Sequence, residues 1–363
     1  MIKIGITQGD INGVGYEVIL KAFENEEMFS LCTPIVYGSP KAATYHKKSF
    51  ENQTSFQTIE SADNARNGML NMVNCFGEDE LKIEFGKSTE AGIEAASITL
   101  KTALADLKEG KIDALVTAPS NGINIALNEE ENNTITNETE YIDSIIGEGR
   151  KSLKIYASEN LRVALATENI PLAQVSQSIS KELIAEKIVM LHNSLKRDFY
   201  IDNPRIAVLS LNPEANLTNE NSEEAAIISP VIEELFKRGV RCFGPYVSNS
   251  YFSTDNYKCF DAVLAMYYDQ GISPFKALSQ NDGYVYNAGI SSVITTTTHG
   301  VQFDIAGQGK ADESSLRHAI YSAIDIARNR NRFDQARRNP LKKQYFEKRD
   351  DSDKLKLDQT EED

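Results

Sequence analysis

The chain has 363 residues, which is longer than a typical domain with one hydrophobic core. Its contents of 41% hydrophobic and 25% charged residues are those of ordinary globular proteins. Its net charge of −15 argues against nucleic acid as a partner, because neutralising phosphates requires a basic face. No stretch approaches the roughly 20 apolar residues of a membrane helix, so no membrane partner is expected. The N-terminus lacks a secretion leader, which predicts a cytoplasmic location. The four scattered cysteines, without CxxC spacing, are expected to be reduced thiols.

The first elements in chain order alternate strand, loop and helix. Ile2–Ile6 alternates apolar and polar residues, which predicts a strand. The glycine-rich turn TQGDINGVG follows it, and then YEVILKAF, which has helical apolar spacing. Residues 34–37 (PIVY) predict a second buried strand, before a helix from Lys41. This order favours an α/β fold with much parallel pairing.

Later segments extend the same alternation. Further strands are predicted at Ala114–Thr117, Leu153–Ala157, Arg162–Ala166, Arg205–Leu209 and Ala262–Met266. Further helices are predicted at Ala91–Lys108, Lys181–Leu195, Glu223–Lys237 and Ser314–Asn329.

Two segments differ in composition from the rest. Residues 127–137 are acidic and Asn-rich, which predicts a mobile loop. Residues 331–363 form a charged segment with few apolar side chains, predicted to be a largely disordered tail, with the disorder mainly from Asn339 onward. Within this tail, a short helix around Leu341–Lys348 is an alternative to disorder.

Two glycine-rich segments are candidate ligand loops. TQGDINGVG matches neither GxGxxG nor a P-loop, and taken alone it favours a simple turn. HGVQFDIAGQGKAD, residues 299–312, has glycines that permit tight turns around an adenosine. The alternative for the second segment is a plain glycine-rich turn with a structural His299. The chain has four histidines, and no two are spaced for a shared metal site: His46, His192, His299 and His318.

A resemblance to a known family enters at residues 263–276, VLAMYYDQGISPFK. This segment resembles the AMYHDQG pattern, followed by a lysine, of the 4-hydroxythreonine-4-phosphate dehydrogenase (PdxA) family. The opening turn is similar to the family's GDPAGIGPE-type segment. Residues 299–312 resemble both the family's segment and the cofactor loop of isocitrate and isopropylmalate dehydrogenases. The resemblance extends from Ile2 to about Arg330.

The resemblance implies an architecture and an activity. The fold would be the two-lobed isocitrate/isopropylmalate dehydrogenase type, with mixed, mostly parallel sheets and a cleft between the lobes. Residues 1–125 plus 275–330 would form one lobe, and 126–274 a second that holds the interface of a homodimer. The family reaction is NAD-dependent oxidation and decarboxylation of 4-phosphohydroxy-L-threonine, in vitamin B6 synthesis.

Site residues are carried over position by position. Catalytic positions match Asp269, Lys276 and Thr139, and the cofactor positions are His299, Gly300, Asp304, Gly307 and Gly309. The family's three metal-binding histidines are replaced by Asn169, Glu214 and Tyr268, so no histidine metal site is expected. Other substrate positions also change: the family's residues there are replaced by Glu138, Val285 and Ile294, and its NK pair by Asn121-Gly122.

Because these changes concentrate on the chemistry, the ancestral activity is expected to be lost or changed. One interpretation is a non-catalytic NAD-binding or regulatory subunit, including one that pairs with an active paralogue. Another is a dehydrogenase for a different hydroxy acid, with Glu214, Asp269 and Glu138 or Glu168 holding magnesium or manganese. For Glu138 and Glu168, solvated loop charges are the simpler interpretation. The ordinary family enzyme is a third interpretation.

Overall fold

A computed structural model describes residues 1–77, 81–126, 134–215, 217–253 and 255–339. Its centre is one twelve-stranded sheet in the order β11-β10-β12-β9-β8-β13-β14-β5-β1-β2-β4-β3. Eight of its eleven strand pairings are parallel and three are antiparallel. The predicted α/β class with mixed, mostly parallel pairing is confirmed.

The strands predicted from the sequence all form. One half of the sheet contains β3 (Phe56–Ile59), β4 (Leu70–Asn74), β2 (Thr33–Gly38), β1 (Lys3–Thr7), β5 (Ala114–Thr117) and β14 (Val293–Thr297). The other half contains β13 (Tyr284–Ala288), β8 (Leu153–Ala157), β9 (Arg162–Leu165), β12 (Ala262–Ala265), β10 (Ile206–Leu209) and β11 (Cys242–Tyr246). The antiparallel pairing of β13 with β14 joins the two halves. The lobe boundaries proposed from the sequence remain a prediction.

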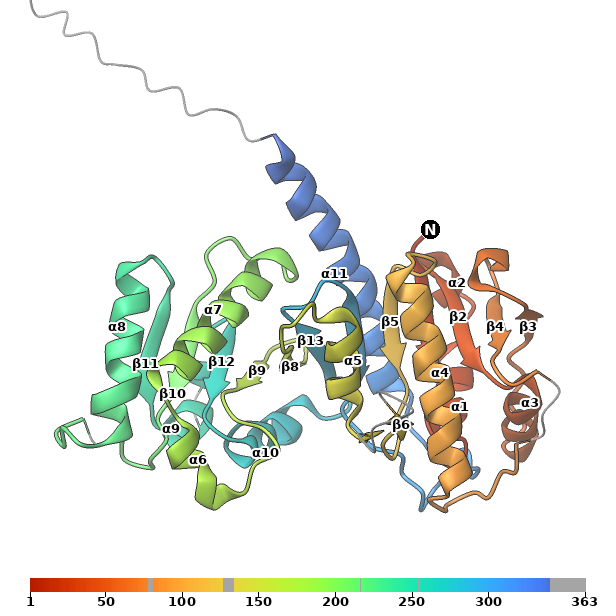
Figure 1. Cartoon of the computed structure of the whole chain (residues 1–363), viewed down its shortest axis with the longest axis horizontal. Helices are drawn as coiled ribbons and strands as arrows, with labels where there is room; N and C mark the ends of the chain where they lie inside the picture. Colours follow the sequence, from red (N-terminus) through yellow and green to blue (C-terminus); the bar gives the residue numbers. More distant parts are fainter. Residues whose placement is uncertain (78–80, 127–133, 216, 254, 340–363) are drawn as a thin grey trace, which may run out of the picture.

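Helices pack along this sheet, and α5 and α11 lie between the two groups of helices in Figure 1. The longer helices are α1 (Gly15–Ala22), α3 (Pro40–Ser49), α4 (Glu90–Lys108), α5 (Glu138–Ile146), α7 (Lys181–Arg197), α8 (Ser229–Lys237), α10 (Tyr268–Ser279) and α11 (Ser314–Arg338). Shorter helices are α2 (Met28–Leu31), α6 (Leu172–Ser178) and α9 (Ser248–Ser253), with 3₁₀ turns at Ala62–Asn64 and Asp255–Cys259 and a π-helical turn at Glu224–Ile228. Among the described residues, no helix has the length and apolarity to cross a membrane.

Two expected boundaries differ from the structure. Helix α11 extends past the predicted end at Asn329 to Arg338, within the charged segment that begins at residue 331, and it ends just before Asn339, from which disorder is mainly expected. The Arg337 guanidinium lies 3.5 Å from the centre of the Phe333 ring, and Asp334 pairs with Arg197 on α7. Residues 340–363, which include the alternative helix at Leu341–Lys348, lie outside the described residues.

The predicted loop at 127–137 is the second case. Thr134–Ile135 forms β7, which pairs antiparallel with β6 (Ile125–Ala126), and backbone hydrogen bonding accounts for the order of these residues. Residues 127–133 lie outside the described residues.

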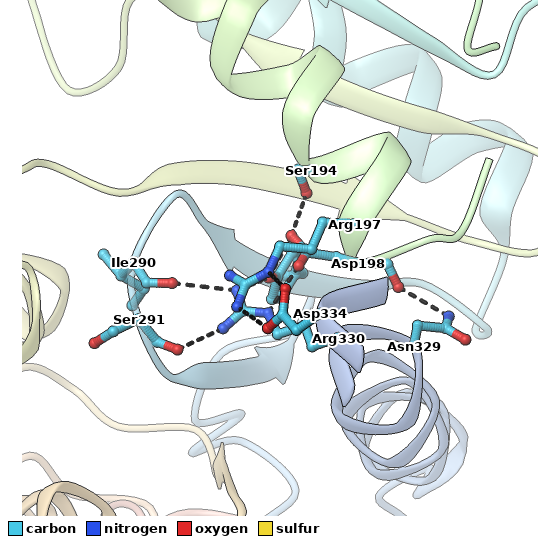
Figure 2. A network of polar contacts seen from close by, with 9 residues as sticks. Ser194, Arg197, Asp198, Ile290, Ser291, Asn329, Arg330 and Asp334 are labelled. Carbon is cyan, nitrogen blue, oxygen red and sulfur yellow. Dashed lines mark hydrogen bonds and ion pairs between the residues drawn. The ribbon is translucent and has the colours of Figure 1, made fainter. Parts of the chain in front are cut away.

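A buried ion pair fixes α11 against α7 and the β13–β14 turn (Figure 2). Arg330 Nε donates to Asp198 Oδ1 at 2.7 Å, and Arg330 Nη2 donates to the Tyr286 hydroxyl at 2.6 Å. That hydroxyl and the Ser194 hydroxyl both donate to Asp198 Oδ2, and the Ser291 carbonyl accepts from Arg330 Nη1. Each charge therefore has several polar partners, which is the condition for a tolerable buried ion pair.

Candidate functional site

The YYDQG segment forms the start of α10. Gln270 is buried there: its Oε1 accepts from the Met266 amide and its Nε2 donates to the Ser210 carbonyl, both at 2.7 Å. A Cβ on Gly271 would lie 2.8 Å from a Val163 methyl carbon, so this helix packs on β9 only with glycine at that position. These two matched residues therefore have structural roles.

A polar cluster lies where β5 and α5 meet β8. The Glu138 carboxylate, partly buried at the start of α5, accepts a hydrogen bond from the Ser120 hydroxyl at 2.9 Å. Burial raises the pKa of Glu138, against the opposing effects of hydrogen bonds from Thr117 and Ser120 and of the nearby Lys154 charge. Lys154 Nζ also lies 3.2 Å from Glu168 Oε2. Glu138 and Glu168 are thus members of one charged cluster, and the simpler expectation of solvated loop charges is wrong.

Two tyrosines extend this cluster along β8. Lys154 and Tyr156 are two residues apart in one strand, so their side chains lie on the same face of the sheet. The rings of Tyr156 and Tyr268 meet edge to face with centroids 6.4 Å apart. Burial, and then the nearby Glu168 charge, raise the pKa of Tyr156. Tyr268, which stands in place of a metal-binding histidine, therefore makes an edge-to-face contact with an aromatic ring.

Strand β13, which pairs with β8, contains a position that the family resemblance assigns to substrate binding. Val285 pairs with Tyr156, and Asn287, which is buried, pairs with Lys154. Since 285 and 287 lie on one face, Asn287 places an amide beside the position where the resemblance expects an asparagine. Ile294 is 1% exposed and packs in the hydrophobic core, where an arginine would have no polar surroundings.

Thr139 and Asn169 line one cavity of about 590 Å³, together with residues of α5, β8 and α7. The Asn137 side chain caps α5 by accepting from the amides of Thr139 and Glu140 at 2.9 and 3.3 Å. Asn169 has a left-handed backbone with φ of 54°, a conformation that asparagine tolerates better than most residues. This cavity is the candidate substrate site.

Lys276 and His299 line a second cavity of about 210 Å³, with Asp312 and Ser315. His299 Nδ1 lies 3.0 Å from the Gly300 carbonyl oxygen, so Nδ1 carries the proton and donates. His299 Nε2 is buried and has no partner among the described residues. Burial lowers the pKa of His299, which keeps the ring neutral and leaves Nε2 as a free hydrogen-bond acceptor.

The other predicted cofactor residues have different surroundings. Gly307 and Gly309 have φ of 75° and 70°. A Cβ on Gly307 would press on the Phe85 ring, and one on Gly309 would press on the Cβ of Phe50. Around Gly300, by contrast, a Cβ would meet nothing within 4 Å. Asp304 is exposed, and its carbonyl accepts from Gln308 Nε2. Gly307 and Gly309 thus shape the loop, and His299 and Gly300 leave room for a ligand.

Backbone amides of the TQGDINGVG turn donate hydrogen bonds to backbone carbonyls of other segments of the chain. The Asp10 amide donates to the Pro119 carbonyl at 3.0 Å, and the Val14 amide donates to the Val301 carbonyl at 3.1 Å. A Cβ on Gly9 would lie 2.2 Å from the Pro119 oxygen, so this residue must be glycine. The turn therefore joins β1 to the loops after β5 and β14, as a simple turn would.

The three positions of the family's metal ligands hold no histidine in this chain. Asn169 lines the 590 Å³ cavity, the Tyr268 ring meets the Tyr156 ring edge to face, Glu214 is exposed, and Asp269 lines a separate cavity of about 560 Å³. Over the described residues, no group of three or more His, Cys, Asp or Glu could hold a metal ion. The residues present in one chain do not fit the histidine site of the family.

Sequence reasoning missed Ser120, Lys154, Tyr156 and Asn287. The alternation of K-I-Y within the predicted strand at 153–157 was the available signal, since it places Lys154 and Tyr156 on one face. Pairing of β8 with β13, which brings Asn287 opposite, is a long-range contact that a single sequence does not specify.

The chain is similar in sequence to one protein family over most of its length. Residues 30–323 match the model of the family described as pyridoxal phosphate biosynthetic protein PdxA. A 4-hydroxythreonine-4-phosphate dehydrogenase of Bacteroides thetaiotaomicron is 50% identical, over 100% of this chain and 99% of that protein. A putative D-threonate 4-phosphate dehydrogenase of Oceanobacillus iheyensis is 32% identical, over 89% of this chain and 97% of that protein.

A solved structure agrees with these sequence matches. The structure of a putative 4-hydroxythreonine-4-phosphate dehydrogenase from Salmonella typhimurium is similar, with a TM-score of 0.75 and 27% identity. The match covers 90% of this chain and 100% of that one. The relatives are dehydrogenases by name, and the chain belongs to the PdxA family.

Proposed function

We propose that this chain is a PdxA-family, NAD-binding protein in which the ancestral reaction is lost or changed. That reaction is the oxidation and decarboxylation of 4-phosphohydroxy-L-threonine in vitamin B6 synthesis. The observation that carries the proposal is the chemistry of the three metal positions, which are occupied by Asn169, Glu214 and Tyr268 and hold no histidine. Loss of several metal ligands at once removes the charge stabilisation that a metal supplies to the forming carbonyl.

The cavity between Lys276 and His299 supports retained nucleotide binding. A neutral His299 with a free Nε2 acceptor suits an amino group such as that of adenine, and Gly300 leaves open space beside it. Lys276 supplies a cation on the same cavity wall, suited to a phosphate or carboxylate. We expect NAD to bind there.

A second candidate function is a dehydrogenase acting on a different hydroxy acid. The Lys154 cluster favours it, because an ammonium group held by Glu168 can stabilise an oxyanion that develops nearby. Glu138, whose pKa is raised, is suited to carrying a proton in the same place. The family's named substrates also vary, since one relative is named for D-threonate 4-phosphate.

The test combines ligand binding with activity on the purified full chain. A melting-temperature scan with NAD, NADP, magnesium, manganese and zinc, alone and in pairs, reports native-state binding through mass action. Turnover of 4-phosphohydroxy-L-threonine with NAD is then measured with and without each metal.

Each outcome decides between the candidates. A shift with NAD, together with turnover reduced by orders of magnitude relative to the Bacteroides relative, supports the main proposal. Strong activity on that substrate would contradict it. Turnover of another hydroxy acid that is lost in Lys154→Met favours the second candidate. A manganese-dependent shift lost in Glu214→Ala would instead establish a carboxylate metal site.

A further inference from the structure

Three cations, Arg150, Lys151 and Lys187, line two cavities at once. One is the 590 Å³ candidate substrate cavity, and the other is a cavity of about 870 Å³ whose lining includes Arg330 and the β13–β14 turn. Arg150 and Lys151 lie in the turn between α5 and β8, and Lys187 projects from α7. Separate segments thus bring three positive side chains to the region that the two cavities share.

None of these three cations is in an ion pair with another described residue. The other cations around the cavities already have partners: Lys154 pairs with Glu168, Arg197 with Asp334 and Arg330 with Asp198 (Figure 2). The cations of this shared region are therefore available to a ligand, whereas Arg330 and Arg197 are committed to protein carboxylates.

The acidic groups nearby do not cancel this charge in the substrate cavity. Its lining carboxylates are Glu140, Asp143 and Glu168. Glu168 is held by Lys154, and Asp143 Oδ2 accepts the Ser152 amide at 3.0 Å. Asp143 has no ion pair with a described residue, and its Oδ1 is buried without a hydrogen-bond partner among them. Three uncommitted cations therefore face two carboxylates without a cationic partner, Glu140 and Asp143. In the larger cavity, Glu148 and Glu186 add two acidic groups, so the excess of positive charge lies on the smaller side.

The α5–β8 turn has a defined shape. The Gly147 amide donates to the Asp143 carbonyl and the Arg150 amide to the Gly147 carbonyl, each at 2.9 Å. Gly149 takes φ of 81°, which a residue with a side chain would resist. These bonds hold the backbone that carries Arg150 and Lys151 between the end of α5 and the start of β8.

We propose that Arg150, Lys151 and Lys187 form a binding site for the oxyanion group, phosphate or carboxylate, of a small ligand. The site rests on the proposed function only in taking the Thr139–Asn169 cavity as the substrate cavity. Ile294, in the apolar core, leaves the anion without an arginine on β14, and the three cations supply positive charge from the α5–β8 turn and α7 instead. Both named relatives act on compounds whose names include a phosphate.

The experiment titrates inorganic phosphate, and separately malonate, into the full-length protein by calorimetry at constant ionic strength. The variants are Arg150→Ala/Lys151→Ala and Lys187→Ala. Lys237→Ala is the matched control, since Lys237 is an exposed lysine on α8 that lines neither cavity. Because each lost charge-assisted hydrogen bond weakens anion binding, we expect about a tenfold or greater rise in Kd in both test variants and no change in the control.

The two probes and the variants decide the proposal. Tighter binding of phosphate than of malonate assigns a phosphate site, and the reverse assigns a carboxylate site. Absence of binding to the unmodified protein, or equal Kd in all variants, would overturn the proposal. Unchanged melting temperatures of the variants confirm that a lost signal reflects the site. Anion binding needs no turnover, so a failed activity assay leaves this result independent.

Discussion

His46 is fully buried beneath the N-terminal glycine-rich turn. Its Nε2 lies 2.7 Å from the Ile11 carbonyl oxygen and must carry the proton, while its Nδ1 is buried without a partner among the described residues. The ring packs between Tyr16 and Phe85, with centroids 5.1 and 4.8 Å away. A second proton on Nδ1 would be a buried, unpaired charge, so burial lowers the pKa of His46 to about 4.

This lowered pKa predicts acid sensitivity. The unfolded state takes up the proton near the ordinary pKa of 6.5, and the folded state only near 4, so stability falls as pH drops between these values. From pH 7.5 to pH 5 we expect a loss of about 2 kcal/mol from this residue. Urea unfolding of His46→Gln should show that much less dependence on pH than the unmodified protein. Parallel pH profiles, or an equal change in the His318→Gln control, would contradict the assignment.

At the residue scale, the sequence identified single positions better than their neighbourhoods. The match of Gln270 and Gly271 with the family pattern was visible in the sequence, but their packing roles required β9 and the Ser210 segment to be placed. The sequence predicts Glu138 and Glu168 to be solvated charges, because Lys154 comes near them only once β8 pairs into the sheet.

At the scale of elements, the first turn of α5 holds the family's Thr139 position. Asn137 caps this turn by accepting two amide hydrogen bonds. Asn137→Ala should cost about 1 kcal/mol of unfolding free energy and speed hydrogen exchange at the amides of Thr139 and Glu140. Asn137→Asp keeps the acceptor and serves as the control, with a loss of a few tenths of a kcal/mol at most. Equal effects of the two substitutions would show that the cap contributes little.

The contact between α7 and α11 offers two ion pairs in contrasting surroundings (Figure 2). The Arg330 and Asp198 side chains are 7% and 3% exposed, whereas those of Arg197 and Asp334 are 38% and 54% exposed. Arg330→Ala leaves Asp198 buried without its countercharge, which should cost about 3–5 kcal/mol. Arg197→Ala should cost about 0–1 kcal/mol, because solvent screens the exposed pair.

Chemical denaturation of both variants measures this difference. Arg330→Met/Asp198→Asn tests its origin, since removing both charges should recover part of the loss. Comparable losses in Arg330→Ala and Arg197→Ala would mean that burial does not set the strength of the pair.

The helices also show where sequence reasoning ends. Apolar spacing placed α4 and α7 to within two residues, because their buried faces repeat at the helical period. The end of α11 was placed too early, since its last turns are exposed and charged. Their order comes from Arg337 over Phe333 and Asp334 against α7, contacts without a periodic apolar signal.

At the scale of the whole molecule, the apolar surface is unevenly distributed. Seven of the ten exposed large hydrophobic side chains among the described residues lie within residues 126–274, the expected second lobe. They are Leu172, Val189, Tyr200, Leu217, Phe236, Tyr246 and Tyr268. An excess of exposed apolar side chains in this range is expected if the lobe carries the interface of the homodimer, which stays a prediction.

A homodimer predicts a mass in solution of twice the chain mass of 40.3 kDa, measurable by light scattering coupled to size exclusion. Leu172 is 70% exposed and begins α6, shortly after Asn169 in the chain, which lines the substrate cavity. Placing a charge there with Leu172→Asp should shift the equilibrium toward monomer, because an interface core excludes unpaired charges. Tyr45→Asp, on α3 of the other half, is the control and should leave the mass unchanged. A monomer at all concentrations would mean that the substrate cavity is completed within one chain, and the cation cluster at Arg150 would then have to bind its ligand without a partner subunit.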